Sequence, residues 1–252
     1  MDNLWNIPML KAQFESKFFD RKMILLILLE MTLIGLAFVY LMKNPQDETE
    51  PSYFTDLMTL ILNNPYIQLA FFIPFFLMFL YEVCEEWSGK ENMIVRFASR
   101  QHWIFHMIVI FFSFATLYAF IFLGVLAAFC YVLLGGPVIG GPVLFLLVFR
   151  YWFSVLTIAF VYLLTYRFVP RNKPVVAILT SMIVILINHL LHFSFLQHWV
   201  PWLSFNVTYV RGFETESIGW TDIFWTQASS MSFVALAMIV LWATIHKMQF
   251  TE

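Results

Sequence analysis

The chain has 252 residues, of which 61% are hydrophobic and only 12% are charged, with 30 phenylalanines and a formal net charge of -2. A soluble domain cannot bury so much apolar surface, so the composition excludes a soluble globular protein and predicts a polytopic membrane protein. A net charge near zero also gives no sign of a nucleic-acid partner. The two cysteines, Cys84 and Cys130, provide neither a disulfide framework nor metal-ligand spacing.

The first predicted element is an interfacial helix within residues 1–22. Leu10, Phe14 and Phe18 recur every four residues, while Lys11 lies on another face. A helix with this pattern lies in the headgroup plane of a membrane. The alternative is a simple positively charged anchor that precedes the first membrane span.

Six stretches of mainly apolar residues follow, each long enough to cross a bilayer. They are residues 23–42, 57–81, 103–126, 143–166, 175–198 and 225–246. Residues 127–134 continue the third stretch and either prolong a tilted helix or start a short re-entrant segment. The glycines and prolines of 135–142 then end the helix. We therefore predict an all-α fold, a single transmembrane domain of six helices over residues 1–252.

The polar loop between the second and third spans, residues 82–102, has a helix signature of its own. Ser88 and Glu91 have the spacing of a capping box, in which each side chain bonds a free backbone amide at the helix start. An apolar stripe follows, with a cation at the far end that suits the helix dipole. These residues are Met93, Ile94, Phe97 and Arg100. A short amphipathic helix in such a loop has no core against which to bury its stripe, so it predicts a partner surface.

The distribution of Lys and Arg predicts the orientation. Eleven of the 14 lie at the termini and in alternate loops: Lys11, Lys17, Arg21, Lys22, Lys90, Arg96, Arg100, Arg167, Arg171, Lys173 and Lys247. Lys43 and Arg211 lie in the opposite loops. By the positive-inside rule both termini and the loops 82–102 and 167–174 are cytosolic, whereas the aromatic loop 199–224 faces out. The predicted location is the cytoplasmic membrane, crossed several times.

Two charged residues fall inside predicted spans, Glu30 in the first and Arg150 in the fourth. A charge in lipid costs several kcal/mol, so both side chains should face protein or water. One interpretation is a pair that gates a transport path or contacts a polar substrate. The other is a structural ion pair between two helices, if helix tilt brings the two depths together.

The histidines do not form a metal-binding pattern. His102 and His106 lie near the cytosolic side, whereas His189 and His192 lie in the outer half of a span, so the two pairs cannot share a metal. We predict that this chain binds no metal and no cofactor.

An enzymatic alternative is an intramembrane protease of the prenyl-endopeptidase, or CAAX, type. Such enzymes use a paired glutamate followed by histidines on later helices, and Glu85-Glu86 is such a pair. Lys90 replaces the arginine of that motif, however, and no Phe-x-x-x-His follows. Carboxylates in a wet loop also lack the desolvation that raises a catalytic pKa. A non-catalytic membrane scaffold or sensor is a third possibility.

The amino-acid sequence of the 82–102 loop resembles that of a known protein family. Glu86-x-x-Gly89, the helix after it, and Ser99-Arg100 before the third span are similar to the Glu…Gly-Thr…Ser-Arg pattern in permease subunits of bacterial ABC-2 type exporters. Six spans, an interfacial N-terminal helix and a long aromatic outer loop resemble the layout of that family. Two departures are Lys90, where the family has Thr, and a histidine where it has a basic residue before the span.

The resemblance implies the membrane subunit of an ATP-driven exporter. A helix at 89–100 would be the coupling helix, docked on a separate ABC ATPase subunit present in two copies, which would bind ATP and Mg²⁺. Two permease chains would pair as a homodimer, and the cargo would be hydrophobic or amphipathic: a peptide, bacteriocin, antibiotic or lipid-like molecule. The residues assigned to coupling are Glu86, Ser88, Gly89, Glu91, Met93, Ile94, Phe97 and Arg100.

Overall fold

The computed structural model describes residues 11, 15, 20–43, 73–88, 100–134, 141–169, 171–193, 228, 231–232, 234–240 and 242–243. The helices in these residues are α2 (Arg21–Lys43), α5 (Ile73–Ser88), α7 (Arg100–Leu134), α8 (Gly141–Phe168) and α9 (Lys173–Phe193). Residues 234–240 are helical as well, and no strand occurs in the described part of the chain. The prediction of an all-helical fold is confirmed for these residues.

Two described stretches are long and apolar enough to cross a membrane, Phe105–Phe129 in α7 and Tyr151–Phe168 in α8. Ile27–Ala37 and Lys173–Ile187 are apolar as well, but shorter. The predicted spans 23–42, 143–166 and 175–198 coincide with most of α2, α8 and α9. Residues 57–72 of the second predicted span, residues 194–198 of the fifth, much of the sixth, and nearly all of the interfacial N-terminal segment lie outside the described residues.

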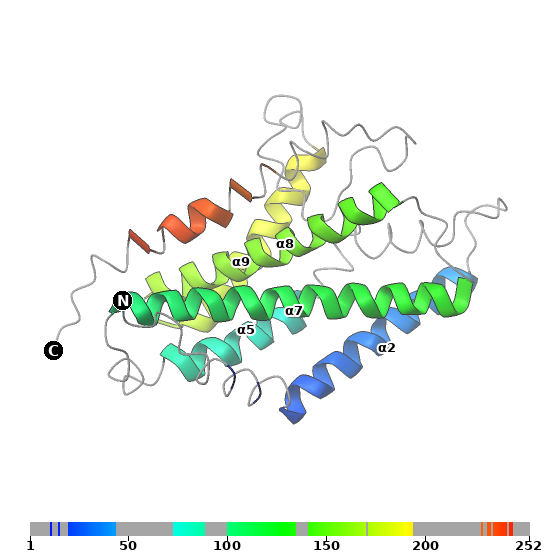
Figure 1. Cartoon of the computed structure of the whole chain (residues 1–252), viewed down its shortest axis with the longest axis horizontal. Coiled ribbons are helices and arrows are strands. Elements are labelled where there is room, and N and C mark those ends of the chain that lie inside the picture. The colour runs from blue at the N-terminus through cyan, green and yellow to red at the C-terminus, as the bar shows by residue number, and fades with distance from the viewer. Residues whose placement is uncertain are drawn as a thin grey trace.

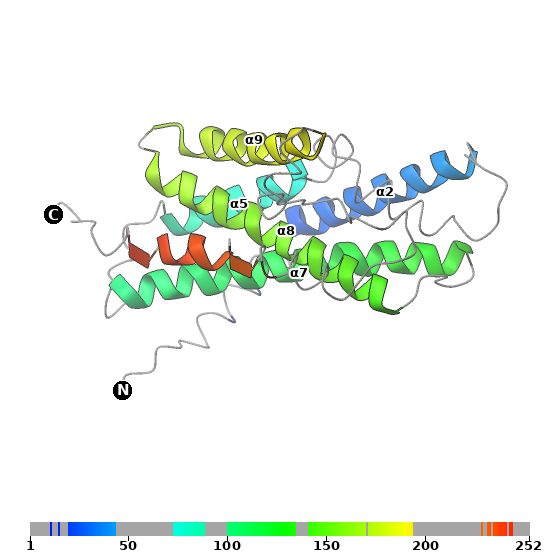
Figure 2. The same ribbon diagram turned by 90° about the horizontal axis from the view of Figure 1, so that it is seen from above.

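The helices alternate in direction. Phe76 and Phe79 of α5 contact Tyr118 and Phe114 of α7, with ring centroids 4.5 and 5.1 Å apart, so the two helices are antiparallel. In Figure 1 the end of α5, the start of α7, the end of α8 and the start of α9 all lie toward the left. Seen from above, α5 and α8 lie between α9 and α7 (Figure 2). The bundle thus gathers these four helix ends on one side.

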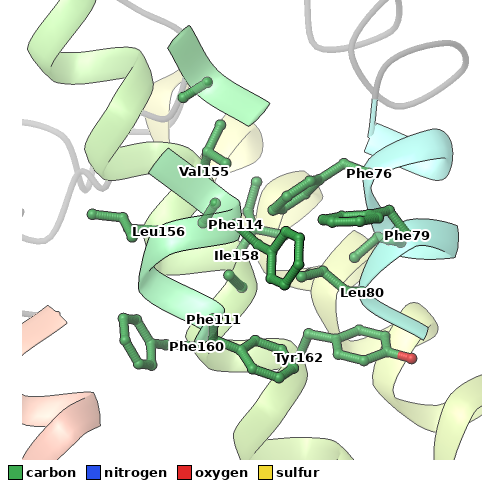
Figure 3. Close-up of a cluster of buried hydrophobic side chains, with 14 of the residues drawn as sticks. Phe76, Phe79, Leu80, Phe111, Phe114, Val155, Leu156, Ile158, Phe160 and Tyr162 are labelled. Atoms are coloured by element: carbon green, nitrogen blue, oxygen red, sulfur yellow. The ribbon is translucent and has the colours of Figure 1, made fainter. Parts of the chain in front are cut away.

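Aromatic side chains fill the centre of this bundle (Figure 3). The largest fully buried side chains are Tyr162, Phe76, Phe111, Phe114, Phe122, Phe160 and Ile34. They come from α2, α5, α7 and α8, so this cluster joins four helices. Aromatic rings contribute large buried areas and favour offset or edge-to-face contacts, such as the edge contact between Phe79 and Phe114.

Helix α7 is a single helix of 35 residues. Its length is roughly 52 Å by helical rise, against about 30 Å for the hydrocarbon core of a bilayer. The helix runs through residues 127–134. These residues therefore prolong the third helix and do not form a re-entrant segment. No proline interrupts this stretch, and Gly124 has open space where a side chain would lie.

Helices α5 and α7 extend into the predicted 82–102 loop from both sides. Helix α5 continues to Ser88 and α7 already begins at Arg100. The physical reason is that Val83 and Cys84 extend the buried face of α5 beyond Leu80, while Glu82 and Glu85 lie on its more exposed side. Polar residues on one face of a helix do not end it, provided that the other face still packs.

A tight turn joins α8 to α9. Asn172 has a positive φ of 51°, a conformation that asparagine tolerates better than most residues. Its carbonyl accepts a hydrogen bond from the Val176 amide at 3.1 Å, and Pro174 in the first turn of α9 needs no amide partner. The turn therefore holds α8 and α9 antiparallel.

Replacing the core ring of Phe114 tests the packing. Phe114 is 1% exposed and packs against Phe79, so Phe114→Ala should lower the free energy of unfolding by about 3–5 kcal/mol. The matched control is Phe120→Ala on the same helix, because Phe120 is 50% exposed and should change stability by under about 1 kcal/mol. Unfolding of the purified protein in detergent by a graded denaturant measures both. Equal losses in the two variants would contradict this packing.

Candidate functional site

The residues assigned to the coupling helix lie mostly outside the described residues. Gly89, Glu91, Met93, Ile94 and Phe97 fall in the undescribed segment 89–99. Glu86 and Ser88 are the last turn of α5 and Arg100 is the first residue of α7, and their side chains are not described. The capping box and the apolar stripe thus stay predictions. The structure does place both ends of the segment, at the same end of the bundle.

An ion pair ties the start of α2 to the end of α5. The Lys22 ammonium donates a hydrogen bond to Oε1 of Glu82, with 2.9 Å between the two atoms. Glu82 is half-buried whereas Lys22 is exposed, and the hydrogen bond that Lys22 donates to Glu82, together with the negative charge of Glu82, raises the pKa of Lys22 above its ordinary value. The pair ties the start of α2 to the second half of α5, six residues before the end of that helix.

The end of the bundle where the 89–99 segment is attached carries further charges. Lys173, at the start of α9, lies 6.0 Å from the ring centroid of Tyr166 on α8, a cation–π distance. Arg171 in the turn is exposed, and Glu85 lies exposed on α5. Among the described residues, cations and carboxylates therefore surround the ends of α5, α7 and α8.

Glu30 lies in the interior of the bundle. Its side chain is 4% exposed, and the hydroxyl of Tyr118 on α7 donates a hydrogen bond to its Oε1 atom. The Tyr118 ring packs in turn on Phe76 of α5. No ion pair to Glu30 occurs among the described residues. The carboxyl thus sits where α2, α5 and α7 meet.

Arg150, the second predicted intramembrane charge, lies on α8, and its side chain is not described. The pairing of Glu30 with Arg150 therefore stays untested. The residue after it, Tyr151, is buried, stacks on Phe122 at 4.8 Å and lies within electrostatic range of Glu30. Two phenols, one on α7 and one on α8, thus lie near the Glu30 carboxyl.

The described residues provide no metal site, because no group of three His, Cys, Asp or Glu side chains comes together among them. His106 is buried near the start of α7, while His189 and His192 lie in α9 with undescribed side chains. Of the glutamate pair in the protease alternative, Glu85 is exposed. The described residues do not assemble a group of catalytic side chains around Glu85.

Tyr118 was missed in the sequence. Counted from the predicted span starts, it lies roughly 22 Å deep, whereas Glu30 lies roughly 10 Å deep, so depth alone does not pair them. In Figure 1 the start of α2 lies well along α7 from the start of α7, so depths counted from the two helix starts do not share one zero level. The one available signal is that a phenol inside an apolar span needs a hydrogen-bond partner.

Comparison of the chain with protein-family models, with curated proteins and with solved structures finds no match to any of them.

Removal of the Tyr118 hydroxyl should destabilise the protein. Tyr118→Phe keeps the ring on Phe76 but leaves the buried Glu30 carboxyl without its phenol donor, which should cost roughly 1–3 kcal/mol of unfolding free energy. Tyr131→Phe, on the same helix but 66% exposed, is the matched control and should stay within about 0.5 kcal/mol of the wild type. Denaturant titration in detergent measures the difference. If the two variants are equally stable, the hydrogen bond does not hold α2 in place.

Proposed function

We propose that this chain is the membrane-spanning subunit of an ATP-driven exporter that moves a hydrophobic or amphipathic cargo across the cytoplasmic membrane. In this proposal it crosses the membrane six times with both termini in the cytosol, and it works as a homodimer with two copies of a separate ATPase subunit. Residues 89–100 form the helix to which the ATPase binds.

One observation supports the proposal: the helices on both sides of the 89–99 segment, α5 and α7, pack against each other in one aromatic core. Phe79 of α5 and Phe114 of α7 are both buried and in edge contact. The Lys22–Glu82 pair further ties α2 to α5. A force applied to the segment between α5 and α7 would therefore act directly on the packed core.

Close packing supports a transmission mechanism. Protein interiors are as dense as organic crystals, so α5 and α7 move together and not past one another over short distances. Tyr118 extends the connection to α2 through its hydrogen bond to Glu30. Closure of an ATP-bound partner shifts the bundle between inward and outward states only if its contacts with the 89–100 helix differ between those states.

The chemistry of the interior supports the choice of cargo. Within the described residues the buried set is dominated by Phe, Leu, Ile and Val, and Glu30 is its one carboxylate. The exposed faces of the described helices are apolar as well, as at Leu25, Leu36 and Tyr40 of α2, and a path between such faces suits an apolar or amphipathic peptide, antibiotic or lipid-like molecule better than a highly charged one. Two chains would enclose such a path between them.

The test places a charge on the apolar stripe of Met93, Ile94 and Phe97, the surface proposed to contact the ATPase. Phe97→Asp would put a carboxylate into an apolar groove of the ATPase, at a cost of more than about 1.4 kcal/mol, and should weaken binding of the ATPase at least about tenfold. Stimulation of ATP hydrolysis by the permease should fall with it. Co-purification and stimulated ATPase activity of the reconstituted complex are the measurements.

Asn92→Asp is the matched control, because residue 92 lies on the opposite side of the predicted helix from Met93, Ile94 and Phe97. It adds the same charge and should leave binding nearly unchanged. Unaltered stimulation in Phe97→Asp, or equal loss in both variants, would count against this stripe as the contact surface.

A further inference from the structure

Helix α2 lies at the edge of the bundle, with many large apolar side chains exposed. These are Ile24, Leu25, Leu28, Leu29, Leu36, Val39 and Tyr40. Its inner face carries Glu30 and Ile34, followed by Gly35, where an added Cβ would lie 3.6 Å from the ring of Phe129. Polar contacts attach α2 to the other helices near its start, where Lys22 binds Glu82, and near its middle, where Glu30 binds Tyr118.

The surroundings of Glu30 favour an uncharged carboxyl. The side chain is 4% exposed, and its described hydrogen-bond partner is a neutral phenol. From α5 the group nearest this contact is the apolar ring of Phe76, which packs on Tyr118. From α8 the titratable groups are Tyr151, within electrostatic range, and Arg150, whose side chain is not described.

An ionised carboxylate in this position would be expensive. Transfer of a carboxylate from water into a poorly solvated interior costs several kcal/mol unless a cation or several donors compensate it. One phenol hydrogen bond recovers only part of that cost. A proton on the carboxyl removes most of the cost, whereas loss of the proton favours a position of α2 in which Glu30 reaches water.

We propose that Glu30 and Tyr118 form a proton-binding site whose occupancy controls whether α2 stays packed on α5 and α7. With the proton bound, Glu30 is neutral and α2 packs as in the structure. When the proton leaves, the charged carboxylate weakens the contact at the middle of α2, while Lys22 and Glu82 still hold its start. The site needs no ATPase partner and is independent of the exporter proposal.

Labelling with dicyclohexylcarbodiimide tests the site on the purified chain in lipid nanodiscs. This apolar reagent reacts with protonated carboxyls in apolar surroundings. The carboxyl proton moves to a carbodiimide nitrogen, a carboxyl oxygen bonds to the central carbon, and the adduct rearranges to a stable N-acylurea without a leaving group. Peptide mass spectrometry then locates the modified residue.

The adduct should form on Glu30 near neutral pH and decrease at least about fivefold between about pH 6 and about pH 9.5. Glu82 is the internal control, because it pairs with the Lys22 ammonium and is more exposed than Glu30, so it should stay unlabelled across this range. In Tyr118→Phe the midpoint of labelling should move to higher pH, since the lost hydrogen bond stabilises the ionised form. Glu30→Gln should remove the adduct, and the wild-type peptide map identifies the site even if that variant does not fold.

Three results would overturn the proposal. The first is no adduct on Glu30 at any pH in this range, and the second is an adduct whose yield does not depend on pH. The third is protection of Glu30 by Na⁺ or K⁺ at constant pH, which would assign the site to a metal cation. None of these results affects binding of an ATPase to the 89–100 segment, so the two proposals fail separately.

Discussion

The contact between α5 and α7 is the constraint on which the rest of the structure depends. Phe76 lies against Tyr118, and Phe79 against Phe114, so two pairs of rings fix both the antiparallel direction and the register of these helices. Because dense interiors resist sliding, the register also fixes where α5 ends and α7 begins. The predicted coupling segment is attached to the ends of these two helices, whose rings are in contact.

Tyr118 links this aromatic contact to the one carboxylate in the described core. Its ring belongs to the packing between α5 and α7, while its hydroxyl binds Glu30 on α2. A motion of α7 cannot leave the environment of Glu30 unchanged, and a change in the charge of Glu30 cannot leave the packing of α2 unchanged. If the chain is a permease subunit, its ATP-driven motion and the protonation of Glu30 are coupled through one side chain, and the coupling is reciprocal.

Much of the fold follows from the sequence because its signals are local. Apolar length predicts α2, α8 and α9 to within a few residues at most ends, and buried Glu30 follows from the cost of a charge in lipid. The end of α5 was placed too early, because Glu82 and Glu85 resemble the start of a loop until Val83 and Cys84 are known to pack. Tyr118 as the partner of Glu30 was not predictable, since it depends on how two helices of different length cross.

The exporter proposal requires that the 89–100 segment is a cytosolic helix and that an ATPase binds it along its apolar stripe. Single cysteines introduced by Asn92→Cys and Ile94→Cys, in a chain without its native cysteines, test it most directly with a membrane-impermeant maleimide in sealed vesicles. Both positions should react only from the cytosolic side, and the ATPase should protect position 94 and leave position 92 reactive. Reaction from the outer side, or equal labelling of position 94 with and without the ATPase, would contradict the account.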